Sequence, residues 1–250
     1  MAGHSKWKQI KHKKAITDAK RAQAWTKLIR EITVAARVGG GGDPGGNPRL
    51  RTAIEAGRAA NMPKENIDRA IKKGTGELEG ANYEEVTYEG YGPGGAAVYV
   101  EATTDNTNRT VAEIRHAFNR NGGSLGAQNS VAWMFDRCGQ IYLDGTRCDE
   151  DAALELALEA GAEDFQRDGD AFVVTTTPQD FHAVLQQLQA RGQPVEDAEL
   201  AMIPQNTVAV SGKEAEQLLK LLDALESLDD VSKVFSNFDM DSSTIAQVTT

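Results

Sequence analysis

The sequence is poor in cysteine and has no long apolar run. Cys138 and Cys148 are its only cysteines, they form no CxxC motif, and no pair of histidines accompanies them. A zinc site is therefore not expected, and the thiols are predicted to be reduced, with a disulfide as the alternative. No stretch approaches the ~18 apolar residues of a membrane span, and the basic N-terminus lacks the apolar core of a secretion signal. We expect a soluble, cytoplasmic protein without membrane contact.

Catalytic and nucleotide-binding motifs are also missing. The histidines show no metal-ligand spacing: His4, His12, His116 and His182. The glycine-rich run 39–48 is followed by no Gly-Lys-Ser/Thr, as a P-loop requires. Asp149, Glu150 and Asp151 open a predicted helix, where acids offset the helix dipole; a metal site is the alternative. The sequence therefore predicts a protein that is not an enzyme, with no catalytic residue, metal, cofactor or small-molecule substrate.

Acidic residues are nearly absent from the beginning of the chain. Residues 1–30 contain nine Lys or Arg against one acid, Asp18, a net charge of +8. Through Thr75 there are 17 basic and 6 acidic residues, a net +11, whereas the remaining 175 residues hold 10 basic and 31 acidic residues, a net −21. This asymmetry predicts that the basic part faces a polyanion while the acidic part keeps the rest of the protein away from it.

The segment 1–14, the basic arm, combines lysines with aromatic rings. Trp7 and Ile10 are its only large apolar residues after Met1, at a spacing that fits neither helix nor strand. The arm therefore has no face to bury and is predicted to be mobile in isolation. Trp7 and His12 among lysines suit stacked bases flanked by phosphates. We interpret the arm as a nucleic-acid contact; a solvated lysine-rich tail is the alternative.

Three amphipathic helices are predicted next. Apolar residues at i, i+3, i+4, i+7 and i+11 indicate a helix over about 17–38, and the run 39–48 is interpreted as a flexible hinge loop. Asn47 and Pro48 begin a second helix, and Pro63 begins a third, with Gly74 just past its end. Together they form a small bundle.

The second and third helices also resemble a helix-turn-helix. That arrangement would place four polar side chains of the third helix on an exposed face for a DNA groove: Lys64, Asn66, Arg69 and Lys73. Glu65 and Asp68 lie on the same helix, so the match is loose. A plain three-helix bundle is the alternative.

Strand patterns replace helices after about residue 82. Strands are expected over 84–92 and 96–104, a helix capped by Asp105 and Asn106 follows, and another strand is expected over 130–135. Near the end of the chain a strand over 207–210, a helix opened by a Ser211–Glu214 capping box and a strand over 231–235 are predicted. These late elements need a sheet, which is available only if the chain returns to the one that begins near residue 84.

The intervening segment has a pattern of its own. Its predicted elements are a strand over 140–143, a helix from Asp149, a hairpin of 163–166 and 171–176, a helix from Pro178 to Arg191 and a strand over 198–203. This β-α-β-β-α-β order is ferredoxin-like. We therefore predict a multi-domain α and α+β fold with an N-terminal three-helix bundle (1–76), a middle α+β domain (82–136 plus 206–240) and an inserted ferredoxin-like domain (137–205).

Several long blocks of the sequence are typical of one known family. They are AGHSKW, IKHKKAITDAKRA, NPRLRTAIEAGRAANMPKENIDRAIKKG, YEGYGPGG (88–95), TDNTNRT (104–110) and SVAWMF. In these blocks the chain resembles the YebC/PmpR family of probable transcriptional regulators, which is similar to a mitochondrial translational activator of cytochrome c oxidase subunit I. The resemblance covers nearly the whole chain and implies the same three-domain architecture. The sequence departs from the family pattern at Gly57, where a better helix former is usual, and at Asn129, where glycine is usual.

The resemblance implies a nucleic-acid-binding regulator of gene expression, a DNA-binding transcriptional regulator. The alternative is a ribosome- or RNA-associated factor that assists translation of difficult sequences. YEGYGPGG and TDNTNRT are expected to be adjacent at one end of the middle sheet, where Arg109 and backbone donors would face a phosphate or a partner; turn and capping roles are the alternative. The predicted nucleic-acid-binding residues are Lys6, Trp7, Lys8, Lys11, His12, Lys13, Lys14, Lys20, Arg21, Arg49, Arg51, Lys64, Asn66, Arg69, Lys72 and Lys73.

Overall fold

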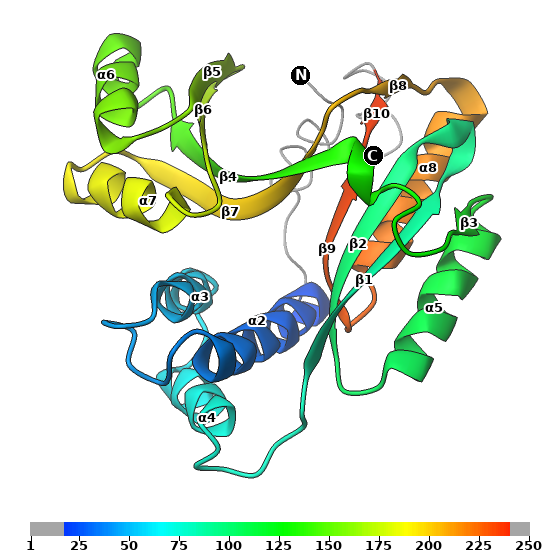
Figure 1. The fold of residues 1–250 in the computed structure, drawn as a ribbon, viewed down its shortest axis with the longest axis horizontal. Coiled ribbons are helices and arrows are strands. Elements are labelled where there is room, and N and C mark those ends of the chain that lie inside the picture. Colours follow the sequence, from blue (N-terminus) through cyan, green and yellow to red (C-terminus); the bar gives the residue numbers. More distant parts are fainter. Residues whose placement is uncertain (1–17, 241–250) are drawn as a thin grey trace. The chain divides into compact units, whose positions relative to one another are not determined.

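The computed structural model describes residues 18–240 of the chain (Figure 1). Its helices are α2 (Asp18–Val38), α3 (Pro48–Ala59), α4 (Lys64–Gly74), α5 (Thr107–Arg120), α6 (Glu150–Ala160), α7 (Phe181–Ala190) and α8 (Gly212–Glu226), with short 3-10 turns η1 (Pro93–Gly95) and η2 (Ala132–Met134). Its strands are β1 (Glu84–Tyr91), β2 (Ala97–Thr104), β3 (Ser124–Leu125), β4 (Phe135–Asp144), β5 (Asp164–Asp168), β6 (Ala171–Thr176), β7 (Val195–Pro204), β8 (Val208–Ala209), β9 (Val231–Ser236) and β10 (Phe238–Asp239).

The chain divides into two compact units. Residues 133–206 form one, and the chain on either side of them forms the other. The predicted fold class is confirmed: a helical bundle, a middle α+β domain and a ferredoxin-like α+β domain inserted into the middle one.

The helices α2, α3 and α4 form the bundle. Their buried core includes Ile32, Leu50, Ile54, Met62 and Ile67. The predicted cap of α3 is confirmed, because the Asn47 side chain accepts the backbone N–H of Leu50 at 3.0 Å. The same side chain donates to the carbonyl oxygens of Ala35 and Gly41, at 2.8 and 3.0 Å, and so holds the loop 39–48 against the end of α2.

Two glycines of the bundle predict opposite responses to alanine. A Cβ at Gly57 would lie 3.6 Å from methyl groups of Ile32 and Ile67, an ordinary contact, so Gly57→Ala should stabilise the protein by about 0.5–1 kcal/mol through helix propensity. A Cβ at Gly74 would lie 2.3 Å from the carbonyl oxygen of Thr33. Gly74→Ala should therefore destabilise by about 1–3 kcal/mol, because α2 and α4 would have to separate. Thermal denaturation measures both, and a destabilising Gly57→Ala would contradict this packing.

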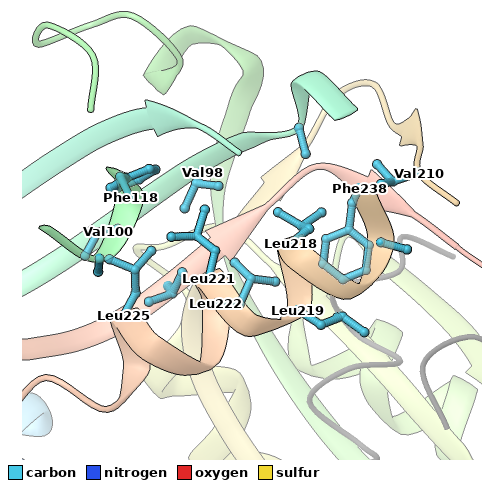
Figure 2. Packing of buried hydrophobic residues seen from close by; sticks show 14 of the residues in the cluster. Val98, Val100, Phe118, Val210, Leu218, Leu219, Leu221, Leu222, Leu225 and Phe238 are labelled. Atoms are coloured by element: carbon cyan, nitrogen blue, oxygen red, sulfur yellow. The ribbon is translucent and has the colours of Figure 1, made fainter. Parts of the chain in front are cut away.

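The middle domain is built on a sheet of order β3-β1-β2-β9, so a strand that follows the insertion does return to the sheet that precedes it. The helices α5 and α8 contribute to one core with this sheet (Figure 2). Five buried leucines of α8 belong to this core: Leu218, Leu219, Leu221, Leu222 and Leu225. The short strand β8 does not join this sheet, because it pairs in parallel with β10.

The inserted unit has a four-stranded sheet of order β5-β6-β4-β7 in which all neighbours are antiparallel. This order and the helices α6 and α7 confirm the predicted ferredoxin-like arrangement. Its core joins Ile141 and Leu143 of β4 and Phe172 of β6 to Ala157 of α6 and Leu188 of α7.

Some local predictions were wrong. The expected strand 130–135 is replaced by η2, and β4 begins only at Phe135. The expected helix from Pro178 begins at Phe181, after a turn in which the Thr177 hydroxyl accepts the N–H of Asp180. Ser211 makes no side-chain cap at the start of α8, so the predicted capping box is absent there.

Candidate nucleic-acid interface

Much of the predicted interface lies outside the described residues. This holds for Lys6, Trp7, Lys8, Lys11, His12, Lys13 and Lys14 of the basic arm. Lys20 and Arg21 lie in the first turn of α2, where only the backbone is described. For these nine residues nucleic-acid binding stays a prediction from the sequence.

The helix α4 carries the predicted cations that the structure does describe. Its buried face consists of Ile67, Ala70 and Gly74, which are spaced at helical intervals and pack in the bundle. The opposite face is exposed and bears Lys64, Glu65, Asp68, Arg69, Lys72 and Lys73. Charge along this face is uneven: the first turns alternate cations with acids, and the last turn has two lysines.

This order of charges suits phosphate contacts better than base recognition. A recognition helix usually contacts base edges with its N-terminal residues. Here Glu65 lies in the first turn, and Asn66 is only partly exposed. The turn of about four residues between α3 and α4 retains the outline of a helix-turn-helix, but the exposed cations Arg69, Lys72 and Lys73 lie toward the other end of the helix.

Two predicted arginines of α3 are held by other groups. Arg49 forms ion pairs with Glu31 and Glu85, at 2.8 and 2.6 Å. Burial lowers the pKa of Arg49, but the hydrogen bonds and charges of Glu85 and Glu31 outweigh it and raise that pKa. Arg51 donates to the carbonyl oxygen of Pro44 at 3.3 Å. Arg49 is therefore engaged by two carboxylates and Arg51 by a loop carbonyl, whereas the cations of α4 are exposed.

The TDNTNRT segment surrounds a buried carboxylate that the sequence analysis missed. Asp230 Oδ2 accepts hydrogen bonds from the hydroxyls of Thr104 and Thr110, at 3.1 and 2.6 Å, and from Arg109 Nη2 at 2.7 Å. Asp230 Oδ1 accepts from Arg30 Nη1 at 2.7 Å. The side chain of Asp230 is only 3% exposed. Arg109 also pairs with Asp105 at 2.8 Å, so two carboxylates hold its guanidinium.

The second glycine-rich motif lies elsewhere. In the β1–β2 hairpin Tyr91 pairs with Ala97 at the turn, and Glu84 pairs with Thr104 at the other end. YEGYGPGG is therefore at the turn end and TDNTNRT at the open end, about 24 Å away for seven residues of strand. The expectation that the two segments are adjacent was wrong. The capping alternative is supported, because the Asn106 side chain caps α5.

The acidic cluster at the start of α6 has structural partners. Within residues 18–240 no group of three or more His, Cys, Asp or Glu side chains is arranged to hold a metal ion. The Asp149 carboxylate caps α6, and Glu150 pairs with Arg167. In the same part of the chain no helix has the length and apolar character needed to cross a bilayer.

Fold and charge together define a multi-domain protein that joins a basic helical bundle to an acidic α+β body. Residues 5–77 match a family model described as the TACO1/YebC protein N-terminal domain, and residues 83–238 match the TACO1/YebC second and third domain. The chain belongs to the TACO1/YebC family, which confirms the resemblance seen in the sequence.

Relatives of known sequence and structure cover nearly the whole chain. A protein of Gemmatimonas aurantiaca named "Probable transcriptional regulatory protein" is 60% identical over 98% of this chain and 99% of its own length. A protein of the same name from Desulfatibacillum aliphaticivorans is 58% identical over 99% of this chain and 100% of its own. The crystal structure of a conserved hypothetical protein, Aq1575 from Aquifex aeolicus, is similar with a TM-score of 0.86 and 51% identity, covering 94% of this chain and 97% of that one.

Proposed function

We propose that the protein is a DNA-binding transcriptional regulator that holds its target chiefly through the phosphate backbone. The observation that carries the proposal is the exposed face of α4, where Arg69, Lys72 and Lys73 are opposite the buried side of the helix. The basic arm adds five lysines and no acid within residues 1–14. The names of the relatives, probable transcriptional regulatory proteins, support a role in regulation. The proposed role is binding rather than catalysis, in the cytoplasm, without metal or cofactor.

Removal of two lysines from α4 tests this proposal. Lys72→Ala with Lys73→Ala should weaken duplex DNA binding for all sequences alike and flatten the slope of log K against log salt by about 1.8, since each phosphate contact contributes about 0.9. The matched control removes two exposed lysines of α8, Lys213 and Lys220. Fluorescence anisotropy across a salt series measures both slopes. Equal flattening in the two variants would show that only overall charge matters and would contradict a site on α4.

A ribosome- or RNA-associated role is the second candidate. It is favoured by Glu65 and Asp68 on the exposed face of α4, which oppose entry into a duplex groove, and by the ring of Trp7 among lysines in the arm.

Trp7→Ala separates the two candidates. If the target is RNA, this variant should lose about 1–3 kcal/mol on unpaired bases and little on duplex DNA, because stacking needs an exposed base face. In contrast, a protein that holds duplex DNA through phosphate contacts of α4 should bind all duplex sequences more weakly in Arg69→Ala and lose little duplex affinity in Trp7→Ala.

A further inference from the structure

The helix α5 carries a row of exposed side chains along its outward side. The spacing i, i+4, i+7 and i+11 places four residues on one face of the helix: Asn108, Ala112, Arg115 and Asn119. All four are exposed. The other side of α5 is buried in the core of the middle domain, where the helix contacts β3 and α8 (Figure 1). We name this row the outer stripe.

Polar groups of the outer stripe are not used by the protein itself. In the described residues 18–240, the side chains of Asn108, Arg115 and Asn119 form no hydrogen bond, ion pair or ring contact. Arg109 differs from them, because two carboxylates hold its guanidinium. The guanidinium of Arg115 offers five N–H donors, and each asparagine offers donors and an acceptor. These groups are available to a ligand.

The helix that presents the outer stripe is held rigidly at its beginning and along its buried side. The side chain of Asn106 caps it, and the hydroxyl of Thr110 donates to the buried carboxylate of Asp230 at 2.6 Å. Further along the helix, Ile114 and Phe118 are fully buried. Precise recognition requires groups on such a rigid element, since donors and acceptors must meet their partners in fixed positions.

Acidic residues are missing from the outer stripe although the surrounding domain is acidic. Residues 82–132 and 207–240 contain 13 acids and 6 basic residues, and three of these basic residues are arginines of α5. The exposed face of α8 includes Glu214 and Glu216. In α5 the one acid, Glu113, lies off the stripe. A face that is merely solvated would be expected to carry acids here, as α8 does, so the outer stripe suits an anionic ligand better than water alone.

We infer that α5 enters the major groove of duplex DNA and reads its base sequence through the outer stripe. Arginine pairs with O6 and N7 of guanine, asparagine pairs with N6 and N7 of adenine, and the methyl group of Ala112 suits a thymine methyl. Asn108 and Asn119 are eleven residues apart, about 16 Å along the helix, which is the length of about five base pairs. The inference rests on the proposed binding of duplex DNA, to which it adds sequence recognition by a second helix.

The outer stripe suits duplex DNA better than RNA. The major groove of B-DNA admits a helix, whereas the deep and narrow major groove of an RNA duplex does not. Unpaired bases are usually held by stacking on aromatic rings, and the stripe contains no Phe, Tyr or Trp. The helix α4 is less suited to reading bases, because it exposes Glu65 and Asp68. We therefore assign base recognition to α5 and phosphate contacts to α4.

The test uses the full chain and a pool of duplex DNA with a randomised central segment. The parent protein should enrich a motif that contains guanine and adenine. Asn108→Ala with Arg115→Ala should bind the enriched duplex at least about tenfold more weakly and a scrambled duplex within about threefold of the parent, because base contacts affect one sequence and phosphate contacts affect all. The matched control, Lys220→Ala, removes one exposed cation from α8 and should enrich the same motif as the parent. Equal melting temperatures establish that both variants are folded.

Four results would overturn the inference. The α5 variant could enrich the same motif as the parent, or it could lose equal affinity for the enriched and scrambled duplexes. A parent protein that binds the pool through Lys72 and Lys73 but enriches no motif would remove base recognition and leave the proposed function intact. Absence of any duplex binding by the parent would contradict the proposed function itself, and this inference with it. A loss by the α5 variant on single-stranded RNA alone would assign the outer stripe to RNA.

Discussion

Replacing Asp230 by alanine is expected to lower the free energy of unfolding by about 3–5 kcal/mol, because removing one partner of a buried ion pair leaves the other charge uncompensated. The carboxylate joins three parts of the chain: Arg30 of α2, Thr104 at the end of β2, and Thr110 with Arg109 at the start of α5. Its loss would remove the only charged acceptor that the described residues show for Arg30, whose other acceptors are the carbonyl oxygens of Thr103 and Asp229. Urea denaturation measures the change.

Asp105 provides the matched control for this experiment. It pairs with the same Arg109, at 2.8 Å, but its side chain is 39% exposed. Asp105→Ala should therefore change stability by less than about 1 kcal/mol, as for other exposed ion pairs. Similar losses in the Asp105 and Asp230 variants would mean that burial of Asp230 does not determine its contribution.

Asp230 also predicts a dependence on pH. Burial raises the pKa of this carboxyl, but hydrogen bonds from Thr110, Arg109 and Thr104 and the charge of Arg30 outweigh burial and hold the pKa below its usual range. The stabilisation is therefore complete above the unfolded pKa of about 3.9 and is lost as the pH falls through the lower folded value. When the pH is lowered below about 4, the free energy of unfolding should therefore fall less in Asp230→Asn than in the parent protein. If the free energy of unfolding fell equally with pH in the variant and the parent, Asp230 would not be the source of the acid sensitivity.

The sequence predicted the elements whose signal is local. Apolar spacing identified α2, the Asn47 cap and Pro48 identified the start of α3, and alternating residues identified β1 and β2. The ferredoxin-like order followed from the order of such elements, since short connections leave few topologies. The expected strand 130–135 failed because the donors of this stretch bind a carboxylate of β1 rather than a neighbouring strand.

The polar centre of the middle domain could not be predicted from the sequence in the same way. Asp230 lies 120 residues from Thr110 and 200 from Arg30, and nothing near it in the sequence marks it as buried. The nucleic-acid-binding residues of the bundle were predicted from their charge, which does not distinguish Arg49 from Lys72. The structure distinguishes them, because Arg49 is ion-paired with Glu31 and Glu85. The departure at Asn129 has a physical explanation in the structure: its φ is +64°, in the left-handed region that glycine adopts at least cost and asparagine tolerates.

Glu89 is expected to determine the conformation of the segment that leads into the inserted unit. Its carboxylate is buried, and it accepts the backbone N–H groups of Asn129, Val131 and Ala132, each at 2.7 Å. Hydrogen bonds to a charged acceptor contribute about 1.5–3 kcal/mol each, but a loop can partly recover them with water, so we expect Glu89→Ala to cost about 2–4 kcal/mol. Exchange of these three amides with solvent should become about a hundredfold faster.

An isosteric variant and a neighbouring acid make this prediction specific. Glu89→Gln keeps the shape of the side chain, but its NH2 group would face a backbone N–H donor. This variant should therefore also accelerate amide exchange, either at Asn129 or at Val131 and Ala132, which bind different carboxylate oxygens. Glu84→Ala removes an exposed acid from the same strand and should change stability by no more than about 0.5 kcal/mol. If the amides of Asn129, Val131 and Ala132 remained as protected in Glu89→Ala as in the parent protein, the loop would be held by its own turn rather than by the carboxylate.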